Sequence, residues 1–262
     1  MSRMLPLIHA GWASVQARAK AGRRREALDC VKRLLSRSDL PTSLAADAHR
    51  LAGELLIDGE KYAKGRRHLR AAAALEPKHA RTQYLIGMAY ENDPHGEDRR
   101  AAARYRNATV LEPKNALYSA CFGRAAVRCD RTKLGVRTML AAADAALADV
   151  NVIRVAISGL LEAGRTASAR RVLTKARFLA PNNRQLTELW TRVRFETARL
   201  QQNTWEPQDA NNAKEGAIST LPFVKLVGAA DRTDAGHGTI RMDAFSKSRP
   251  HFPKLLSLKA DR

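Results

Sequence analysis

A short motif recurs along the chain at nearly constant intervals. Leu-Glu-Pro-Lys stands at 75–78 and again at 111–114, and Leu-Ala-Pro follows at 179–181. The three prolines are separated by 36 and 68 residues, and the second interval is twice 34. A further copy is therefore expected near position 147, where Leu147 stands instead of proline. A period of this length indicates an array of stacked repeats.

Three other positions follow the same period: a bulky side chain, an alanine three residues later, and a glycine in the preceding segment. They are Leu69, Tyr105, Met139 and Leu173; Ala72, Ala108, Ala142 and Ala176; and Gly53, Gly87 and Gly123. In each of these series one interval is 36 residues long and the others are 34. The shared excess of two residues places a single insertion in segment 92–98.

Each repeat is predicted to be a pair of amphipathic helices. Segments 46–57 and 80–91 combine a helical spacing of apolar residues with good helix formers. A turn follows, and the second helix ends near the Leu-x-Pro because proline cannot continue a helix. One pair cannot bury its apolar faces alone, so neighbouring pairs are expected to stack.

This pattern resembles the tetratricopeptide repeat (TPR) family over residues 8–202. The resemblance implies an all-α fold, a right-handed α-solenoid of about five helix pairs with a C-terminal capping helix. The predicted units are 8–43, 46–79, 80–115, 116–149 and 150–183, followed by the capping helix 184–202. In the first and last units, Val15 and Ile157 replace the glycine at which the two helices cross.

The two ends of the chain lack the repeat. Residues 1–7 are predicted to be an N-terminal leader, although the acid-free, Arg-containing segment 1–25 also fits a transit peptide. Residues 203–262 have no period and are predicted to be a largely disordered tail. Its apolar islands, 221–229 and 251–258, are interpreted as docking segments or as segments that fold back onto the solenoid.

The chain is strongly basic, with 46 Lys and Arg against 26 Asp and Glu, a formal charge of +20. Such a charge attracts nucleic acid, anionic lipid and acidic proteins, but an Ala- and Arg-rich composition also reflects GC-rich coding DNA. The basic residues of the second helices are alternatively interpreted as a solvated face that keeps the protein soluble. An odd count of three cysteines does not suggest a disulfide framework. No apolar run approaches the roughly 18 residues of a membrane span. These features together predict a cytoplasmic protein.

No motif for catalysis or cofactor binding is present. A Gly-rich phosphate loop and HExxH are both missing, and the seven histidines show no metal-ligand spacing. Cys121 and Cys129 are eight residues apart and are interpreted as packing residues rather than zinc ligands. The sequence therefore predicts a protein that is not an enzyme, with no catalytic residue, cofactor or metal.

In the TPR family the first helices of the pairs line a concave groove that holds a partner segment. By register, the predicted partner-binding residues are Trp12, Gln16, Arg50, Glu54, Tyr84, Met88, Arg124, Arg128 and Arg154. Tyr84 and Met88 precede the three arginines of the fourth and fifth units, Arg124, Arg128 and Arg154. The groove is therefore predicted to hold a segment with an apolar end and an acidic end. The tail segment 221–227 is one candidate for the apolar half. Glu54 argues against the clamp with which some family members grip an acidic C-terminus.

The second helices form the outer, convex face in this family and carry many of the basic residues. The predicted polyanion-binding residues there are Arg66, Arg67, Arg70, Arg100, Arg104, Arg170, Arg171 and Lys175. The first hypothesis for function is a protein–protein scaffold or adaptor whose partner, a protein or peptide, is unidentified. One alternative is nucleic-acid binding through the convex face; the other is a regulatory subunit of a separate enzyme.

Overall fold

The computed structural model describes residues 5–203, which form eleven α-helices. The first members of the pairs are α1 (Leu5–Lys20), α3 (Thr42–Asp58), α5 (Ala80–Glu91), α7 (Ala116–Arg128) and α9 (Val150–Glu162). The second members are α2 (Arg24–Leu35), α4 (Tyr62–Leu75), α6 (Asp98–Leu111), α8 (Thr132–Ala145) and α10 (Thr166–Leu179), and α11 (Arg184–Asn203) follows. Because α1 begins at Leu5, part of the predicted 1–7 leader is helical. The predicted tail beyond Asn203, with both apolar islands, lies outside the described residues.

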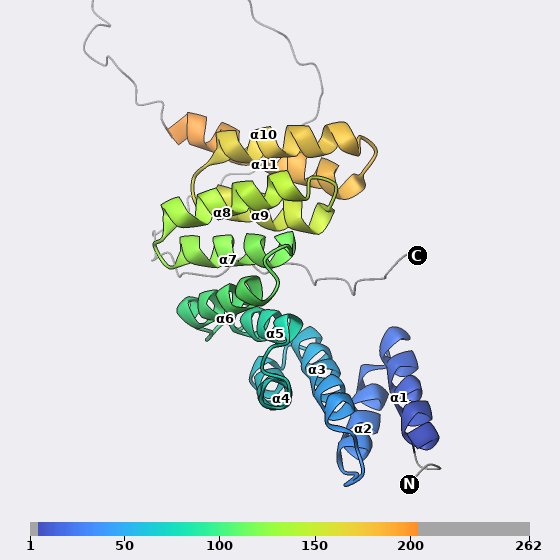
Figure 1. The fold of residues 1–262 in the computed structure, drawn as a ribbon. Coiled ribbons are helices and arrows are strands. Elements are labelled where there is room, and N and C mark those ends of the chain that lie inside the picture. Colours follow the sequence, from blue (N-terminus) through green and yellow to red (C-terminus); the bar gives the residue numbers. More distant parts are fainter. Residues whose placement is uncertain (1–4, 204–262) are drawn as a thin grey trace, which may run out of the picture.

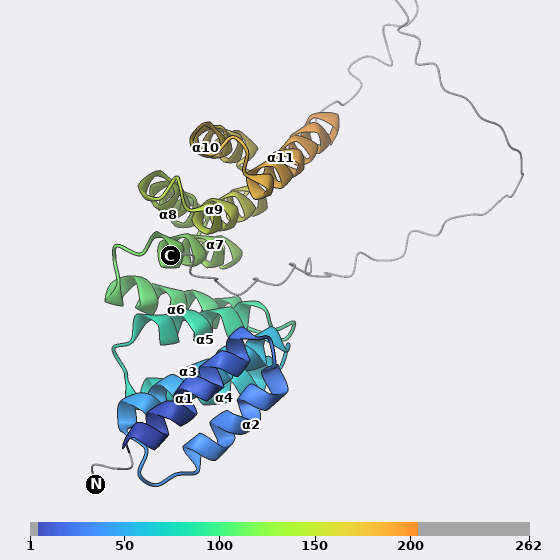
Figure 2. The same cartoon turned by 90° about the vertical axis from the view of Figure 1, so that its right-hand side faces the viewer.

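The helices pack in consecutive pairs, and the pairs stack in a row, so the predicted all-α solenoid is confirmed. Figure 1 shows the row running from α1 and α2 at one end to α10 and α11 at the other. In the upper half of Figure 2, the second helices α8 and α10 lie on one side of the row and α9 and α11 on the other. The row therefore has a first-helix side and a second-helix side.

Direct contact between the periodic residues explains why a glycine and a bulky residue recur together in successive repeats. Leu69, Tyr105, Met139 and Leu173 are completely buried. A Cβ atom added to Gly53 would meet the side chain of Leu69 at 2.5 Å. One added to Gly87 would meet the ring of Tyr105 at 2.7 Å. Each glycine therefore provides the space that the bulky residue of its own repeat fills. The insertion in segment 92–98 widens the spacing between them from 16 residues (Gly53 to Leu69) to 18 (Gly87 to Tyr105), and the contact is kept.

The ends of the helices follow from local sequence signals. Helices α4, α6 and α10 end at Leu75, Leu111 and Leu179, two residues before a proline, as the repeat predicts. The first helices α5, α7 and α9, and also α11, begin after a residue whose side chain accepts a hydrogen bond from a backbone N–H of the first turn. These capping residues are His79, Asn115, Asp149 and Asn183, and such caps satisfy otherwise unpaired backbone groups.

A pair of histidines lies between the two helices of the second repeat. Nδ1 of His49 on α3 is 3.0 Å from Nδ1 of His68 on α4, so one ring donates the hydrogen bond that the other accepts. Burial lowers the pKa of both imidazoles. The charge of His68 lowers the pKa of His49 further, and the charge of Lys32 acts in the same direction on His68. The pair therefore stays neutral in the folded protein to a lower pH than in the unfolded chain.

We expect this pair to weaken the fold as the solution becomes acidic. Between the ordinary histidine pKa of about 6.5 and the lower folded values, the unfolded chain binds more protons, so stability falls as pH falls. Urea denaturation at pH 7.5 and pH 5.5 measures the difference. The double variant His49→Gln/His68→Gln should lose less stability over that interval than the unmodified protein. An equal loss in both would show that other groups govern the acid response.

Candidate partner-binding surfaces

Ion pairs join consecutive first helices into one continuous surface, which we call the first-helix surface (α3, α5, α7 and α9). Glu54 on α3 pairs with Arg81 on α5 at 2.5 Å. Glu91 on α5 pairs with Arg124 on α7 at 2.7 Å. Arg128 on α7 then holds Glu162 on α9 through two hydrogen bonds of 2.8 and 3.0 Å. Each ion pair joins a helix of one repeat to a helix of the next. These charged side chains therefore connect neighbouring repeats.

Glu91 is the centre of a buried charge network. Its carboxylate pairs with Arg124 and Arg128 and accepts a hydrogen bond of 2.6 Å from the hydroxyl of Tyr105. Only 6% of the Glu91 side chain and 12% of the Arg124 side chain are exposed. Burial alone would raise the pKa of Glu91, but the charges of Arg124 and Arg128 outweigh burial and hold it below the ordinary value. Arg124 and Arg128, two of the three arginines predicted to meet the acidic end of a ligand, are therefore already neutralised.

Aromatic packing occupies the middle of the first-helix surface. The ring of Tyr84 stacks on that of Tyr118, with centroids 4.9 Å apart, and lies 5.8 Å from that of Tyr105. Met88 packs partly buried against the same core. Tyr84 and Met88 remain half-buried, so each offers only part of its side chain to a partner.

The remaining predicted groove residues nearer the N-terminus differ in accessibility. Arg50 is buried and pairs with Glu76 at 2.6 Å and with Asp47. Trp12 packs partly buried in the core of the first repeat, whereas Gln16 is exposed. Arg50 and Trp12 therefore contribute mainly to structure.

Arg154 on α9 is unlike the other arginines of this surface. It is half-buried, and its Nη2 atom lies 3.5 Å from Oδ1 of Asn151. Within residues 5–203 its guanidinium forms no ion pair with a carboxylate. Burial lowers the pKa of Arg154, and the charge of nearby Arg124 lowers it further. A carboxylate from a partner would relieve this repulsion, because a partly buried charge is costly until it is paired.

The predicted convex residues divide into two groups. Arg66 pairs with Asp93 at 2.6 Å and lies over the ring of Tyr90, and Arg70 donates to the hydroxyl of that tyrosine. Arg100 pairs with Glu97, Arg104 donates to Gln83, and Lys175 pairs with Asp144. In the part of the chain that the structure describes, Arg67, Arg170 and Arg171 are exposed and form no such contact. The structure therefore does not bring the whole predicted set together as a free basic face.

Residues 5–203 show no sign of a metal site, a reactive thiol at Cys121 or a membrane span. Among them, no group of three or more His, Cys, Asp or Glu side chains is placed to hold a metal ion. Burial raises the pKa of the Cys121 thiol to about 12, which keeps it protonated and unreactive at neutral pH. No helix within 5–203 is long and apolar enough to cross a membrane.

The chain resembles known proteins in its fold and not in its sequence. No family model and no curated protein sequence matches the chain. Similar solved structures do exist. The MamA RS-1 ArsTM double mutant is 16% identical with a TM-score of 0.54, over 66% of this chain and 93% of that one.

Two further structures share the architecture. YrrB, described as a TPR protein with an unusual peptide-binding site, is 15% identical with a TM-score of 0.50, over 68% of this chain and 88% of that one. Cut9, from the Cut9–Hcn1 complex of the APC/C, is 17% identical with a TM-score of 0.52, over 68% of this chain but 34% of that one. At these identities the likeness concerns the fold alone. The chain thus has the helix-pair solenoid fold of tetratricopeptide repeat proteins.

Proposed function

We propose that this protein is a non-enzymatic scaffold whose first-helix surface binds an extended segment of a partner protein. The fold supports this proposal, since repeat solenoids present long surfaces assembled from several units. YrrB, which has the same fold, is described as having a peptide-binding site. The observation that carries the proposal is Arg154, a half-buried cation without a carboxylate partner among the described residues.

The ion pairs on the first-helix surface allow the expected ligand segment to be described in more detail than the sequence alone allows. Arg124 and Arg128 are neutralised by Glu91 and Glu162, so the acidic end of the segment should meet Arg154. The half-buried Tyr84 and Met88 lie toward the other end, where an apolar side chain fits best. The proposed ligand segment therefore has one essential carboxylate and an apolar residue N-terminal or C-terminal to it.

Reversal of one charge tests this proposal. With a captured partner in hand, Arg154→Glu should weaken binding at least tenfold, or about 1.4 kcal/mol, because a carboxylate would then face a carboxylate. Arg154→Lys should retain part of the affinity. The matched control is Arg67→Glu, the same charge reversal at an exposed position on α4, which should bind normally. Isothermal calorimetry supplies the affinities, and equal affinities for Arg154→Glu and the unmodified protein would place the interface elsewhere.

A further inference from the structure

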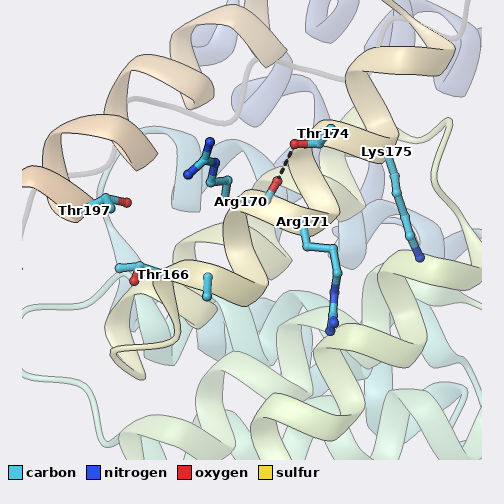
Figure 3. Close-up of a pocket in the computed structure, with 7 residues that line it drawn as sticks. Thr166, Arg170, Arg171, Thr174, Lys175 and Thr197 are labelled. Carbon is cyan, nitrogen blue, oxygen red and sulfur yellow. Dashed lines mark hydrogen bonds between the residues drawn. The ribbon is translucent and has the colours of Figure 1, made fainter.

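An open hollow lies between helices α10 and α11 at the C-terminal end of the solenoid. A cavity of about 480 Å³ is lined by Thr166, Arg170, Arg171 and Thr174 of α10 and by Thr197 of α11. A smaller cavity of about 210 Å³ also touches Arg170 and Thr197 and extends along α11 to Trp190 and Arg194. The two adjoin, and we call them together the α10–α11 cleft. In Figure 3, Arg170 extends from α10 toward the side of Thr197, whereas Arg171 and Lys175 extend away from it.

The surroundings of this cleft are strongly and unusually basic. Residues 165–203 contain nine Lys and Arg but only two acidic residues, Glu188 and Glu196. Within the described residues, the guanidiniums of Arg170, Arg171 and Arg194 have no carboxylate or hydrogen-bond partner. This contrasts with Arg66, whose charge is neutralised by Asp93. The cleft therefore presents free positive charge toward an anion.

Exposed aromatic side chains accompany this charge. Phe178 is 87% exposed, and it continues the helical stripe of Ala167, Arg171 and Thr174, because residues spaced four, seven and eleven positions apart share one face. Phe195 is 67% exposed and follows Arg194 directly. Trp190 lines the cleft itself, and the guanidinium of Arg177 lies 4.9 Å from its ring centroid. Phe178 thus lies about two turns along α10 from the unpaired Arg171, and Phe195 lies beside Arg194. Exposed apolar side chains close to free cations favour a ligand with both anionic and aromatic groups.

We propose that the α10–α11 cleft binds single-stranded nucleic acid, with Arg170 and Arg194 pairing with phosphates and Phe178 stacking on an unpaired base. Single strands combine phosphates with exposed base faces, and proteins bind them through positive grooves and aromatic platforms. A duplex keeps its base faces covered, and an acidic peptide leaves Phe178 without a stacking partner. The site is separate from the first-helix surface and does not depend on the proposed scaffold function.

The first test compares matched charge deletions in the full chain. Fluorescence anisotropy with labelled 15-nucleotide oligo-uridine and oligo-deoxythymidine measures affinity over a salt series. The variant Arg170→Ala/Arg194→Ala should bind at least tenfold more weakly. Its log–log salt slope should be shallower by about 1.4, since two single-strand phosphates lose their contacts. The control Arg67→Ala/Arg106→Ala removes the same charge at exposed sites on α4 and α6 and should change affinity less than twofold.

The second test separates stacking from charge. Phe178→Ala should lose at least about fivefold in affinity, the lower end expected for one base stack, while Phe178→Trp should retain binding. Because this side chain is almost fully exposed, neither change should alter the circular dichroism spectrum. Equal losses in the two double-arginine variants, an unchanged Phe178→Ala, or equal competition by duplex or by poly-L-glutamate would each overturn the proposal.

Discussion

Replacement of Glu91 by glutamine is expected to lower the free energy of unfolding by about 3–5 kcal/mol. This carboxylate is the shared partner of Arg124 and Arg128 and accepts the hydroxyl hydrogen of Tyr105. Removal of one partner of a buried ion pair leaves the other charge desolvated and uncompensated, which accounts for a loss of this size. Glutamine keeps the shape of the side chain, so the loss reports the charge rather than a cavity. Urea denaturation monitored by circular dichroism at 222 nm gives the value.

The matched control is Glu162→Gln at the outer end of the same network. Glu162 is four times as exposed as Glu91, at 24% against 6% of its side chain, and among residues 5–203 its one ion pair is with Arg128. Exposed ion pairs contribute about 0–1 kcal/mol, so this variant should lose no more than that. Similar losses for the two variants would show that Glu91 is not the buried centre of the network.

A methyl group added at Gly135 is the second change with a large expected effect. The Cβ atom of Gly135→Ala would lie 2.5 Å from the backbone oxygen of Gly123 and 2.6 Å from Cγ2 of Val127. Backbone oxygen cannot move aside as a side chain does, so helices α7 and α8 would have to separate. We expect a net loss of at least about 2 kcal/mol, toward the upper end of overpacking costs.

The same glycine-to-alanine substitution at Gly11 is the control, and it is expected to change the stability in the opposite direction. Gly11 lies inside α1, and an added Cβ would meet no atom within 4 Å. Alanine is favoured over glycine in a helix by about 0.5–1 kcal/mol, so Gly11→Ala should stabilise the protein slightly. Thermal denaturation of the two variants compares them directly. A stabilised Gly135→Ala would mean that α7 and α8 cross less closely than the structure shows.

The sequence predicted the repeated packing well because that packing is local to each helix pair. A glycine and the bulky residue that fills its space, such as Gly53 and Leu69, lie in one repeat, so a spacing of 16 residues, or 18 where the insertion intervenes, captures the contact. The proline that follows α4, α6 and α10 is equally local. The left-handed backbone of Glu60, with φ of 61°, could not be predicted from local sequence, because the adjacent Gly59 would adopt it at lower cost yet has an ordinary φ of −90°.

Contacts between repeats were much harder to predict. Register placed Glu91, Arg124 and Arg128 on first helices, but their mutual pairing depends on how closely α5 and α7 approach. Likewise, Arg66 and Arg170 occupy comparable second helices, yet only Arg66 meets an acid, Asp93 of the inserted loop. The charge imbalance of 165–203 was visible in the sequence, whereas the cleft and the exposure of Phe178 required the packing of α10 against α11.

Site-specific photo-crosslinking tests most directly whether a partner lies along the first-helix surface. A benzophenone amino acid is introduced singly at Leu117 on α7, at Leu161 on α9, and at Val110 on α6, which is 69% exposed on a second helix. Irradiation in cells followed by nuclease treatment should give the same protein adduct from Leu117 and Leu161, and that adduct should diminish with Arg154→Glu. An adduct from Val110 alone, or adducts that disappear after nuclease treatment, would contradict the proposed scaffold function.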